Sequence, residues 1–220
     1  MTGHWAASGL ADWMAATAGK SAASARRITG ILGIMRWLLV LFFLGRPFWE
    51  AKTPEHWSDR EIEALRNDSP WAQTVGPEPK VLVYLATAAP IEEAEEEARL
   101  RSRNPLAEPD PDYLDYLREN RDKAFVLAVP EVTAAGLGRA GEEEAMEENT
   151  GMVIGRKTYR ILGHFPPTEA DPVLRLVFPR VAEATDKTIL FHLYLPGVTF
   201  PNREAEFRMK DLLYHGKPAM

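Results

Sequence analysis

The sequence predicts an α+β fold in which a mainly antiparallel sheet of about five or six strands packs against two or three helices. Two continuous apolar runs, at 80–86 and 124–129, are typical of buried strands. Two predicted helices lie between them: an acidic one at 91–101, which begins after Pro90, and one at 111–120, which begins at Pro111 and has an apolar stripe. From residue 152 onward, short segments with β periodicity follow one another. One apolar helix near the amino terminus is expected to precede this unit.

Composition supports a sizeable core but disfavours nucleic acid as a partner. The chain has 220 residues, of which 45% are hydrophobic, which suits one globular domain with extensions. Residues 1–45 carry four basic side chains and one acidic side chain, so 22 basic and 31 acidic residues remain from Arg46 onward, a net charge of −9. Such a charge repels phosphate backbones. The chain has no cysteine, which excludes disulfides, thiol nucleophiles and thiolate metal sites.

The first apolar segment predicts that the chain is targeted to a membrane. Residues 1–27 have low complexity and are expected to be a disordered leader or an over-extended gene start. Residues 28–45 are apolar apart from Arg36. If translation starts at Met1, this segment is a short span for a hydrocarbon core of about 30 Å, and Arg36 costs about 2.5–3.5 kcal/mol there. If it starts at Met35, residues 37–44 form the apolar core of a signal peptide or anchor.

Cleavage of this segment is not favoured, because a signal peptidase requires small residues at −3 and −1, and the candidate sites after Gly45 and Ala51 have Phe43 and Trp49 at −3. We therefore favour a single-pass anchor with the domain outside the cytoplasm over an exported, periplasmic protein. A buried core helix of a soluble protein is the remaining alternative, since shorter apolar runs also occur in cores.

Residues 46–75 are expected to form an aromatic, helical collar. Ser58 and Glu61 have the spacing of a capping box, so a helix should begin there and end near Asn67. Three tryptophans of this segment are interpreted mainly as packing residues, with membrane-interface anchoring as the alternative: Trp49, Trp57 and Trp71.

Residues 76–220 are expected to form the α+β domain. After the strand at 124–129 comes a glycine-rich and glutamate-rich excursion, at 131–151. A hairpin with a turn at 155–157 is predicted next. Further strands are expected at 173–178, at 188–195, which is apolar on both faces and so central, and at 204–210, whose outer face is charged.

Three motifs suggest phosphate or metal binding, but the residues around each motif do not fit the corresponding site. Residues 136–141 match G-x-G-x-x-G, yet they do not directly follow a strand and precede three glutamates. Residues 19–21 resemble the end of a P-loop without its first glycine or its strand. Asp110, Asp112 and Asp115 lack the glycine and the closing glutamate of a calcium loop, and are interpreted as a helix start. No cofactor and no metal site are predicted.

No set of catalytic residues is predicted either. None of the five histidines has the i, i+4 spacing of a zinc site: His4, His56, His164, His192 and His215. His192 lies within an apolar strand, and with His164 and Asp171 it could form a base with an orienting partner. This defines the alternative function, a hydrolase-like enzyme with a site near His192. The favoured interpretation is an ordinary strand histidine.

Several segments after the apolar run carry a resemblance. Residues 46–50 (RPFWE), Trp57-Ser58 with Glu61, and residues 68–72 (DSPWA) resemble a group of exported or membrane-anchored bacterial proteins without an assigned activity, and 186–188 and 207–211 are similar to the group's carboxyl end. The resemblance covers the chain from about Arg46. It implies export, favours the start at Met35 and carries over no catalytic residue.

These observations together predict an envelope-associated protein that is a non-enzymatic binding or structural module outside the cytoplasm. Its expected partners are the membrane, through the apolar segment, and another envelope protein that pairs with the alternating strand at 204–210.

Overall fold

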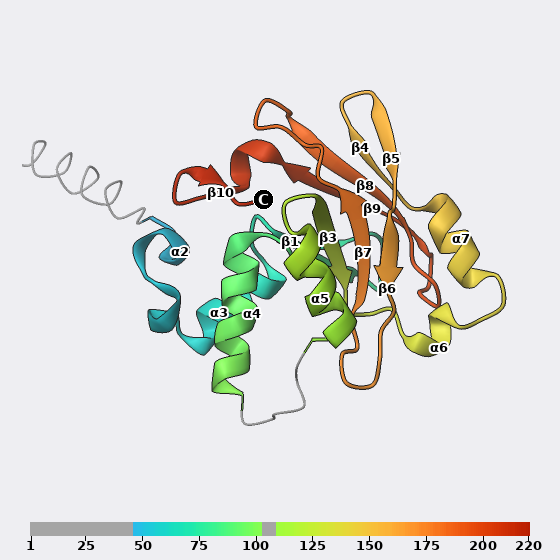
Figure 1. The fold of residues 1–220 in the computed structure, drawn as a ribbon, viewed down its shortest axis with the longest axis horizontal. Coiled ribbons are helices and arrows are strands. Elements are labelled where there is room, and N and C mark those ends of the chain that lie inside the picture. Colours follow the sequence, from blue (N-terminus) through green and yellow to red (C-terminus); the bar gives the residue numbers. More distant parts are fainter. Residues whose placement is uncertain (1–45, 103–108) are drawn as a thin grey trace, which may run out of the picture. The chain divides into compact units, whose positions relative to one another are not determined.

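The computed structural model describes residues 46–102 and 109–220, and residues 48–220 form one compact unit. The unit is α+β, and its sheets are antiparallel, as predicted (Figure 1). The apolar segment at 28–45 and the motif at 19–21 lie outside the described residues. No helix among the described residues combines the length and apolar character needed to cross a membrane.

The larger sheet, sheet A, has five strands in the order β1-β2-β3-β7-β6. Its strands are β1 (Ala72–Val75), β2 (Val81–Leu85), β3 (Ala124–Val129), β6 (Gly163–Phe165) and β7 (Leu174–Pro179). Both apolar runs form internal strands, because β2 and β3 each have a hydrogen-bonded neighbour on both sides. All six residues of β3 are buried, as expected of a strand covered on both faces.

The second sheet, sheet B, has the order β5-β4-β8-β9. Its strands are β4 (Gly151–Ile154), β5 (Lys157–Arg160), β8 (Thr188–Tyr194) and β9 (Asn202–Arg208), and a short ribbon follows, β10 (Leu213–Tyr214) with β11 (Lys217–Pro218). β4 and β5 form the predicted hairpin, with Gly155 at a φ of 59° in its turn. β9 alternates between exposed and buried residues, so its charged face is exposed as predicted.

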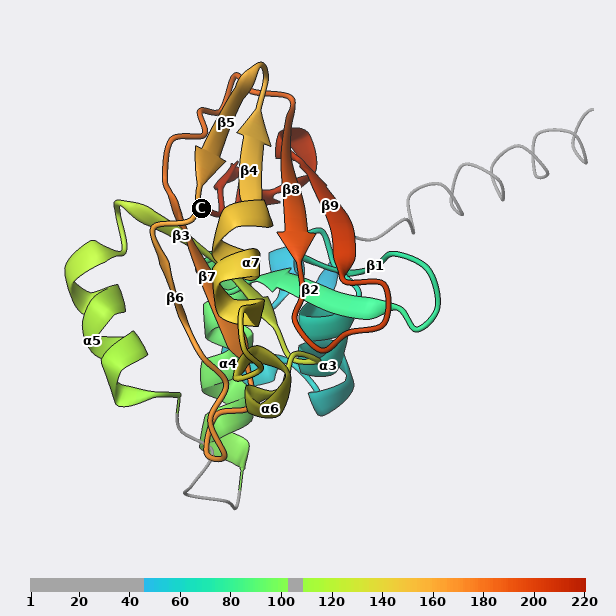
Figure 2. The same ribbon diagram turned by 90° about the vertical axis from the view of Figure 1, so that its right-hand side faces the viewer.

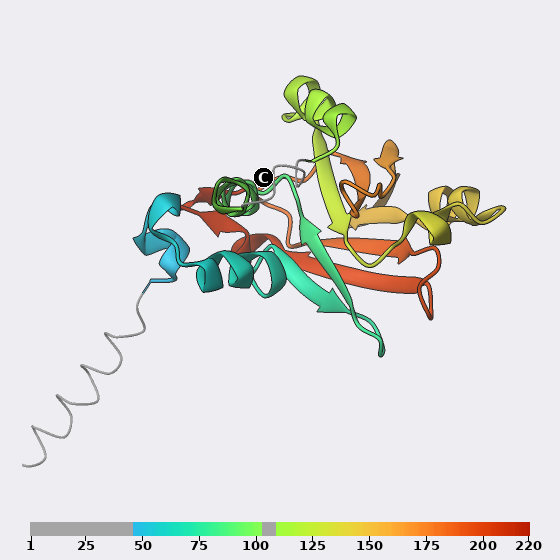
Figure 3. The same ribbon diagram turned by 90° about the horizontal axis from the view of Figure 1, so that it is seen from below.

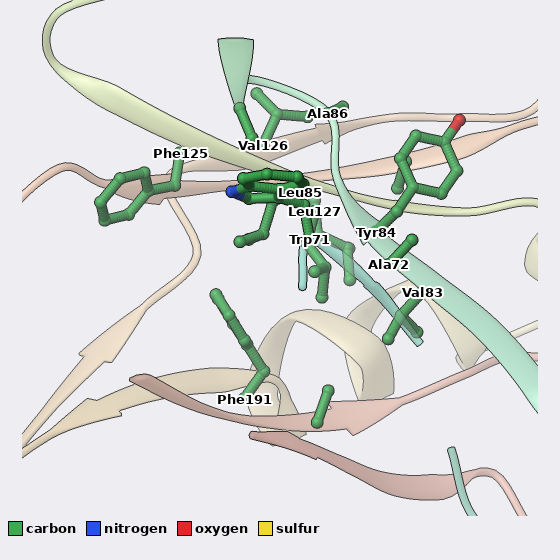
Figure 4. Packing of buried hydrophobic residues seen from close by; sticks show 14 of the residues in the cluster. Trp71, Ala72, Val83, Tyr84, Leu85, Ala86, Phe125, Val126, Leu127 and Phe191 are labelled. Carbon is green, nitrogen blue, oxygen red and sulfur yellow. The ribbon is translucent and has the colours of Figure 1, made fainter. Parts of the chain in front are cut away.

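The two sheets pack face to face and enclose the main core. Phe178 on β7 and Phe191 on β8 lie 4.9 Å apart between ring centroids and join the sheets. Figure 4 shows Trp71 beside Leu85 and Leu127 of sheet A, with Phe191 facing them from sheet B. The side chain of Trp71 is fully buried, and that of Trp57 nearly so. The predicted packing role of these two tryptophans is therefore confirmed.

Helices cover the outer face of sheet A and the ends of the sheets. Figure 3 shows α4 and α5 on the side of β3 and β7 that faces away from β8 and β9. Figure 1 shows α6 and α7 at one end of the sheets, and Figure 2 views the molecule from that end. Their bounds are α2 (Phe48–Ala51), α3 (Asp59–Asn67), α4 (Ala89–Arg101), α5 (Pro111–Asn120), α6 (Ala134–Leu137) and α7 (Glu142–Asn149), with 3-10 turns at Pro54–His56 and Met209–Asp211.

Helix starts follow the predicted chemistry. At the start of α3, the Glu61 amide donates to the Ser58 hydroxyl and the Ser58 amide donates to the Glu61 carboxylate, so the capping box is confirmed. At the start of α5, the carboxylate of Asp110 accepts a hydrogen bond of 2.8 Å from the Asp112 amide. The interpretation of these aspartates as a helix start is confirmed for this pair.

The expectation of one sheet with two or three helices needs correction. The described residues form two main sheets, and six α-helices are present among them. β1 and β6 escape prediction because they are short, with four and three residues, and lack a clear alternation. In the segment 46–75, α3 packs on α4 and β1 pairs with β2.

Candidate functional site

A row of polar side chains crosses the outer face of sheet A beneath α4 and α5. Tyr84 on β2 is opposite Ala128 on β3, and Ala128 is opposite Arg175 on β7, so all three side chains share one face. Arg175 and Tyr84 are buried. A buried guanidinium is costly unless it is paired, so the partners of Arg175 decide whether this row is a site or a structural network.

Arg175 is held by two neighbours. Its Nη1 and Nη2 donate to the two carboxylate oxygens of Asp171, at 2.5 and 3.2 Å, and its Cζ lies 4.3 Å from the centroid of the Tyr113 ring. Burial alone lowers the pKa of Arg175, but the hydrogen bond and the charge of Asp171 outweigh burial and raise it above its ordinary value. Asp171 also accepts the amide of Asp110, which ties this pair to the start of α5.

Glu95 of α4 completes the row. Loss of hydration raises the pKa of its carboxyl group, against the lowering effects of the Arg175 and Arg66 charges and of a hydrogen bond with Tyr84. Burial also raises the pKa of the Tyr84 hydroxyl, and the charge of Glu95 adds to that effect. Arg175, Tyr84 and Glu95 thus each interact with a neighbouring ionisable group, although the buried Nε of Arg175 has no hydrogen-bond partner among the described residues. We interpret the row as a structural network that fastens both helices to sheet A.

A second cluster joins α7 to sheet A. His164 on β6 lies between two glutamates that are one turn apart on α7: its Nε2 is 3.3 Å from Oε1 of Glu143, and its Nδ1 is 3.4 Å from Oε1 of Glu147. The histidine side chain is 9% exposed, whereas the glutamate side chains are 57% and 51% exposed. One ligand atom from each residue lies within 4.8 Å of the other two. Among the described residues, this is the group of side chains that could hold a metal ion.

The structure does not bring together the three residues considered as a base with an orienting partner. His192 lies on the outward-facing side of β8, where its Nδ1 is 3.1 Å from Oε1 of Glu204 on β9, and the two side chains are 45% and 68% exposed. His164 is bound to α7, and Asp171 to Arg175. Within the part of the chain that the structure describes, no serine or threonine hydroxyl hydrogen-bonds to His192.

Two other histidines also have local partners on the surface. His56 Nδ1 is 3.0 Å from the Thr53 hydroxyl, and His215 Nδ1 is 3.5 Å from a carboxylate oxygen of Glu50. His4 lies outside the described residues.

The glycines at 136–141 have local structural roles, in packing for Gly136 and in a left-handed backbone conformation for Gly141. Thr133 caps the four-residue helix α6, and Gly141, at a φ of 82°, precedes α7. Gly136 lies against the backbone of Pro196 and Gly197, where an added Cβ would come within 2.9 Å of the Pro196 carbonyl oxygen. The tight contact between α6 and the β8–β9 loop explains this glycine. The motif does not follow directly on a strand, as expected from the sequence.

An open groove of about 540 Å³ lies beside the buried Trp57. Its walls carry both signs of charge. Lys52 donates to Glu61 at 2.6 Å, and Arg101 donates to the Trp57 carbonyl at 2.6 Å and to Asp59 at 3.1 Å. The hydrogen bond from Lys52 and those from Ser58 lower the pKa of Glu61 to about 2. These pairings hold α2, α3 and α4 together.

Sequence reasoning missed Glu143 and Glu147 as partners of His164. The i, i+4 spacing of the two glutamates in a helix was present as a signal. The histidine that faces them is 17 residues further along the chain, on a strand that the sequence did not predict.

Comparisons of the chain with protein-family models, with curated proteins and with solved structures give no match. The resemblance of the segments after Arg46 therefore rests on those residues alone.

Proposed function

We propose that this chain is an envelope-associated protein whose folded unit is a non-enzymatic binding or structural module outside the cytoplasm. The apolar segment at 28–45 would anchor this unit to the membrane or direct its export. The net charge of −9 from Arg46 onward agrees with a soluble unit beside that segment.

The separation of His192, His164 and Asp171 from one another is the observation that carries the non-enzymatic part of the proposal. A general base and its orienting group must lie within hydrogen-bond reach of each other at a place that substrate can enter. His192, His164 and Asp171 instead have separate partners on different elements. The His192–Glu204 contact is the one feature that the hydrolase alternative would use, and it lies on an exposed strand face.

An edge of sheet B offers a surface for a partner. β9, the strand considered from sequence, is an edge strand, but the side chain of Gln73 on β1 donates to the Glu206 carbonyl at 3.0 Å and occupies part of that edge. β5 is the opposite edge, and no side chain of the described residues is hydrogen-bonded to its backbone. We therefore place strand addition at β5.

The charge at β5 indicates the kind of partner. Arg156, Lys157 and Arg160 are exposed, and within residues 46–102 and 109–220 none of them has an acidic partner. Three unpaired basic side chains on one hairpin stand out in a unit with a net negative charge. We propose an extended, acidic segment of another envelope protein as the occupant.

Site-specific photo-crosslinking in cells tests this proposal. A photoreactive residue in place of Thr158, at the centre of β5, should give a discrete adduct that disappears in the variant Lys157→Glu/Arg160→Glu. The control Lys187→Glu/Lys210→Glu changes net charge equally at exposed positions outside β5 and should leave the adduct unchanged. An adduct that survives the first variant, or an equal adduct from the outer face of β9, would contradict strand addition at β5.

A further inference from the structure

We propose that Glu143, Glu147 and His164 form a binding site for a divalent transition-metal ion of the zinc class. The proposal goes beyond the binding role suggested above, because it rests on a different part of the molecule and does not need a partner at β5. It starts from side chains of two elements, one helix and one strand, that are brought together only by the fold.

The positions of the three side chains suit a metal centre. One turn of α7 places both carboxylates on the same side of the helix, and β6 presents the imidazole between them, with Nε2 3.3 Å from Glu143 and Nδ1 3.4 Å from Glu147. An ion bonds to one nitrogen of an imidazole, so both carboxylates must turn towards the same ring nitrogen. Ligand atoms around a tetrahedral zinc ion lie about 3.4 Å apart, given bonds of about 2.0–2.2 Å. One nitrogen of His164 and one oxygen of each glutamate lie within 4.8 Å of one another, so these atoms must close by at most about 1.4 Å. Rotation of two half-exposed glutamate side chains can supply it.

Burial and charge add independent support. His164 is the fixed member, with only 9% of its side chain exposed, so little of its freedom remains to be lost on binding. The carboxylates are open to solvent, which gives an ion a path of entry and room for a water ligand. In the part of the chain that the structure describes, no lysine or arginine pairs with either carboxylate.

The helix itself attracts cations. Five of the eight residues of α7 are glutamates, and its last turn has no basic residue. Glu142 is engaged by the Tyr194 hydroxyl at 3.2 Å, which leaves Glu144 and Glu148 as exposed charges beside the proposed ligands. Together they raise the local concentration of divalent ions.

The donor set selects the class of ion. A neutral imidazole suits zinc, copper, nickel and iron, whereas calcium and magnesium prefer six or more oxygen ligands and rigid octahedral oxygen shells, respectively. An ion held here would link α7 to β6 by bonds that exist only in the folded chain. Binding must therefore stabilise the folded state.

The test is calorimetric titration of the full chain, purified in mild detergent without a histidine tag, with zinc chloride. We expect one zinc ion per chain, and a rise in melting temperature of about 5–10 °C at a zinc concentration about 100 times the dissociation constant. Magnesium at the same concentration should give neither effect.

Variants assign the ion to these residues. Glu143→Gln and Glu147→Gln should each weaken zinc binding by about tenfold or more, because each removes a proposed ligand. The matched changes Glu144→Gln and Glu148→Gln lie on the same helix and remove only a nearby charge. Each of them should weaken zinc binding less than about threefold. Circular dichroism of each variant confirms that it is folded. The absence of zinc binding by the unchanged chain would overturn the proposal, as would an equal loss in the matched variants.

Discussion

Arg175 and Asp171 form a buried, two-pronged ion pair on the outer face of sheet A, with nitrogen–oxygen distances of 2.5 and 3.2 Å. Their side chains are 5% and 8% exposed. The pair does more than neutralise a buried charge. Asp171 accepts the amide of Asp110 and Arg175 covers the ring of Tyr113, so the pair fastens the start of α5 to β7.

Removal of one partner of this pair should destabilise the unit strongly. Asp171→Ala leaves the Arg175 guanidinium buried without a counter-charge, and we expect the free energy of unfolding in urea to fall by about 3–5 kcal/mol. The control Asp115→Ala breaks an exposed ion pair with Arg118, in which nitrogen and oxygen are 2.5 Å apart. It should change the free energy of unfolding by less than about 0.5 kcal/mol. Equal effects of the two changes would show that burial of the pair does not matter.

The contact between the two sheets gives a second prediction. Phe191 is fully buried and packs against Phe178 and Phe207, with ring centroids 4.9 and 5.9 Å away. Phe191→Ala should lower the free energy of unfolding by about 3–5 kcal/mol, through lost burial and a new cavity. Leu162→Ala, at a side chain that is 62% exposed, should change it by less than about 0.5 kcal/mol. A mild effect of Phe191→Ala would mean that the sheets do not share this core.

The capping box gives a prediction about ionisation. Because the hydrogen bond from Lys52 is the largest influence that lowers the pKa of Glu61 to about 2, Lys52→Met should raise that pKa towards its ordinary value. Titration of the carboxylate by nuclear magnetic resonance measures it, with Lys210→Met as the control. The stabilisation from the box is present above pH 4.5 and is lost as the pH falls towards 2. A midpoint near 4.5 in the unchanged chain would disprove the pairing.

Glu95 should give the opposite dependence on pH. Its pKa is raised in the folded state, so the folded state binds this proton more tightly than the unfolded state does. Stability from this group is complete below about pH 4.5 and falls as the pH rises through the folded pKa. Glu95→Gln should therefore make the loss of stability above pH 4.5 smaller, measured by urea unfolding at several pH values.

Glu96, the neighbour of Glu95 in α4, provides the matched control. Hydrogen bonding to Arg99 lowers the pKa of Glu96, so this group contributes stability that is present above pH 4.5 and lost at lower pH. Glu96→Gln should thus leave the fall above pH 4.5 in place. If both variants reduce the dependence of stability on pH equally, the pKa of the Glu95 carboxyl group is not raised by burial.

Local chemistry made several elements predictable from sequence. β3 and α5 have the bounds that were expected, because the first is a continuous apolar run and the second begins with an aspartate followed by proline. The Ser58–Glu61 capping box needs only a spacing of three residues. Each of these features is decided within one segment, and so the sequence alone was sufficient.

Features that depend on distant segments were not predictable in this way. The division of the strands between two sheets depends on which edges pair after the chain collapses. The partner of Arg175 was not identified, although an arginine within the apolar strand at 173–178 indicated a need for one. The meeting of Glu143 and Glu147 with His164 likewise requires β6 to be placed beside α7.

The most direct test of the central claim, that the chain belongs to the cell envelope, is amino-terminal sequencing of the protein recovered from membrane, periplasmic and cytosolic fractions of its native cells. We predict recovery in the membrane fraction with Met35 as the first residue and the segment 37–44 intact. Recovery from the periplasm after cleavage beyond residue 44 would keep the location and replace the anchor with a signal peptide. Recovery wholly in the cytosolic fraction would contradict the account.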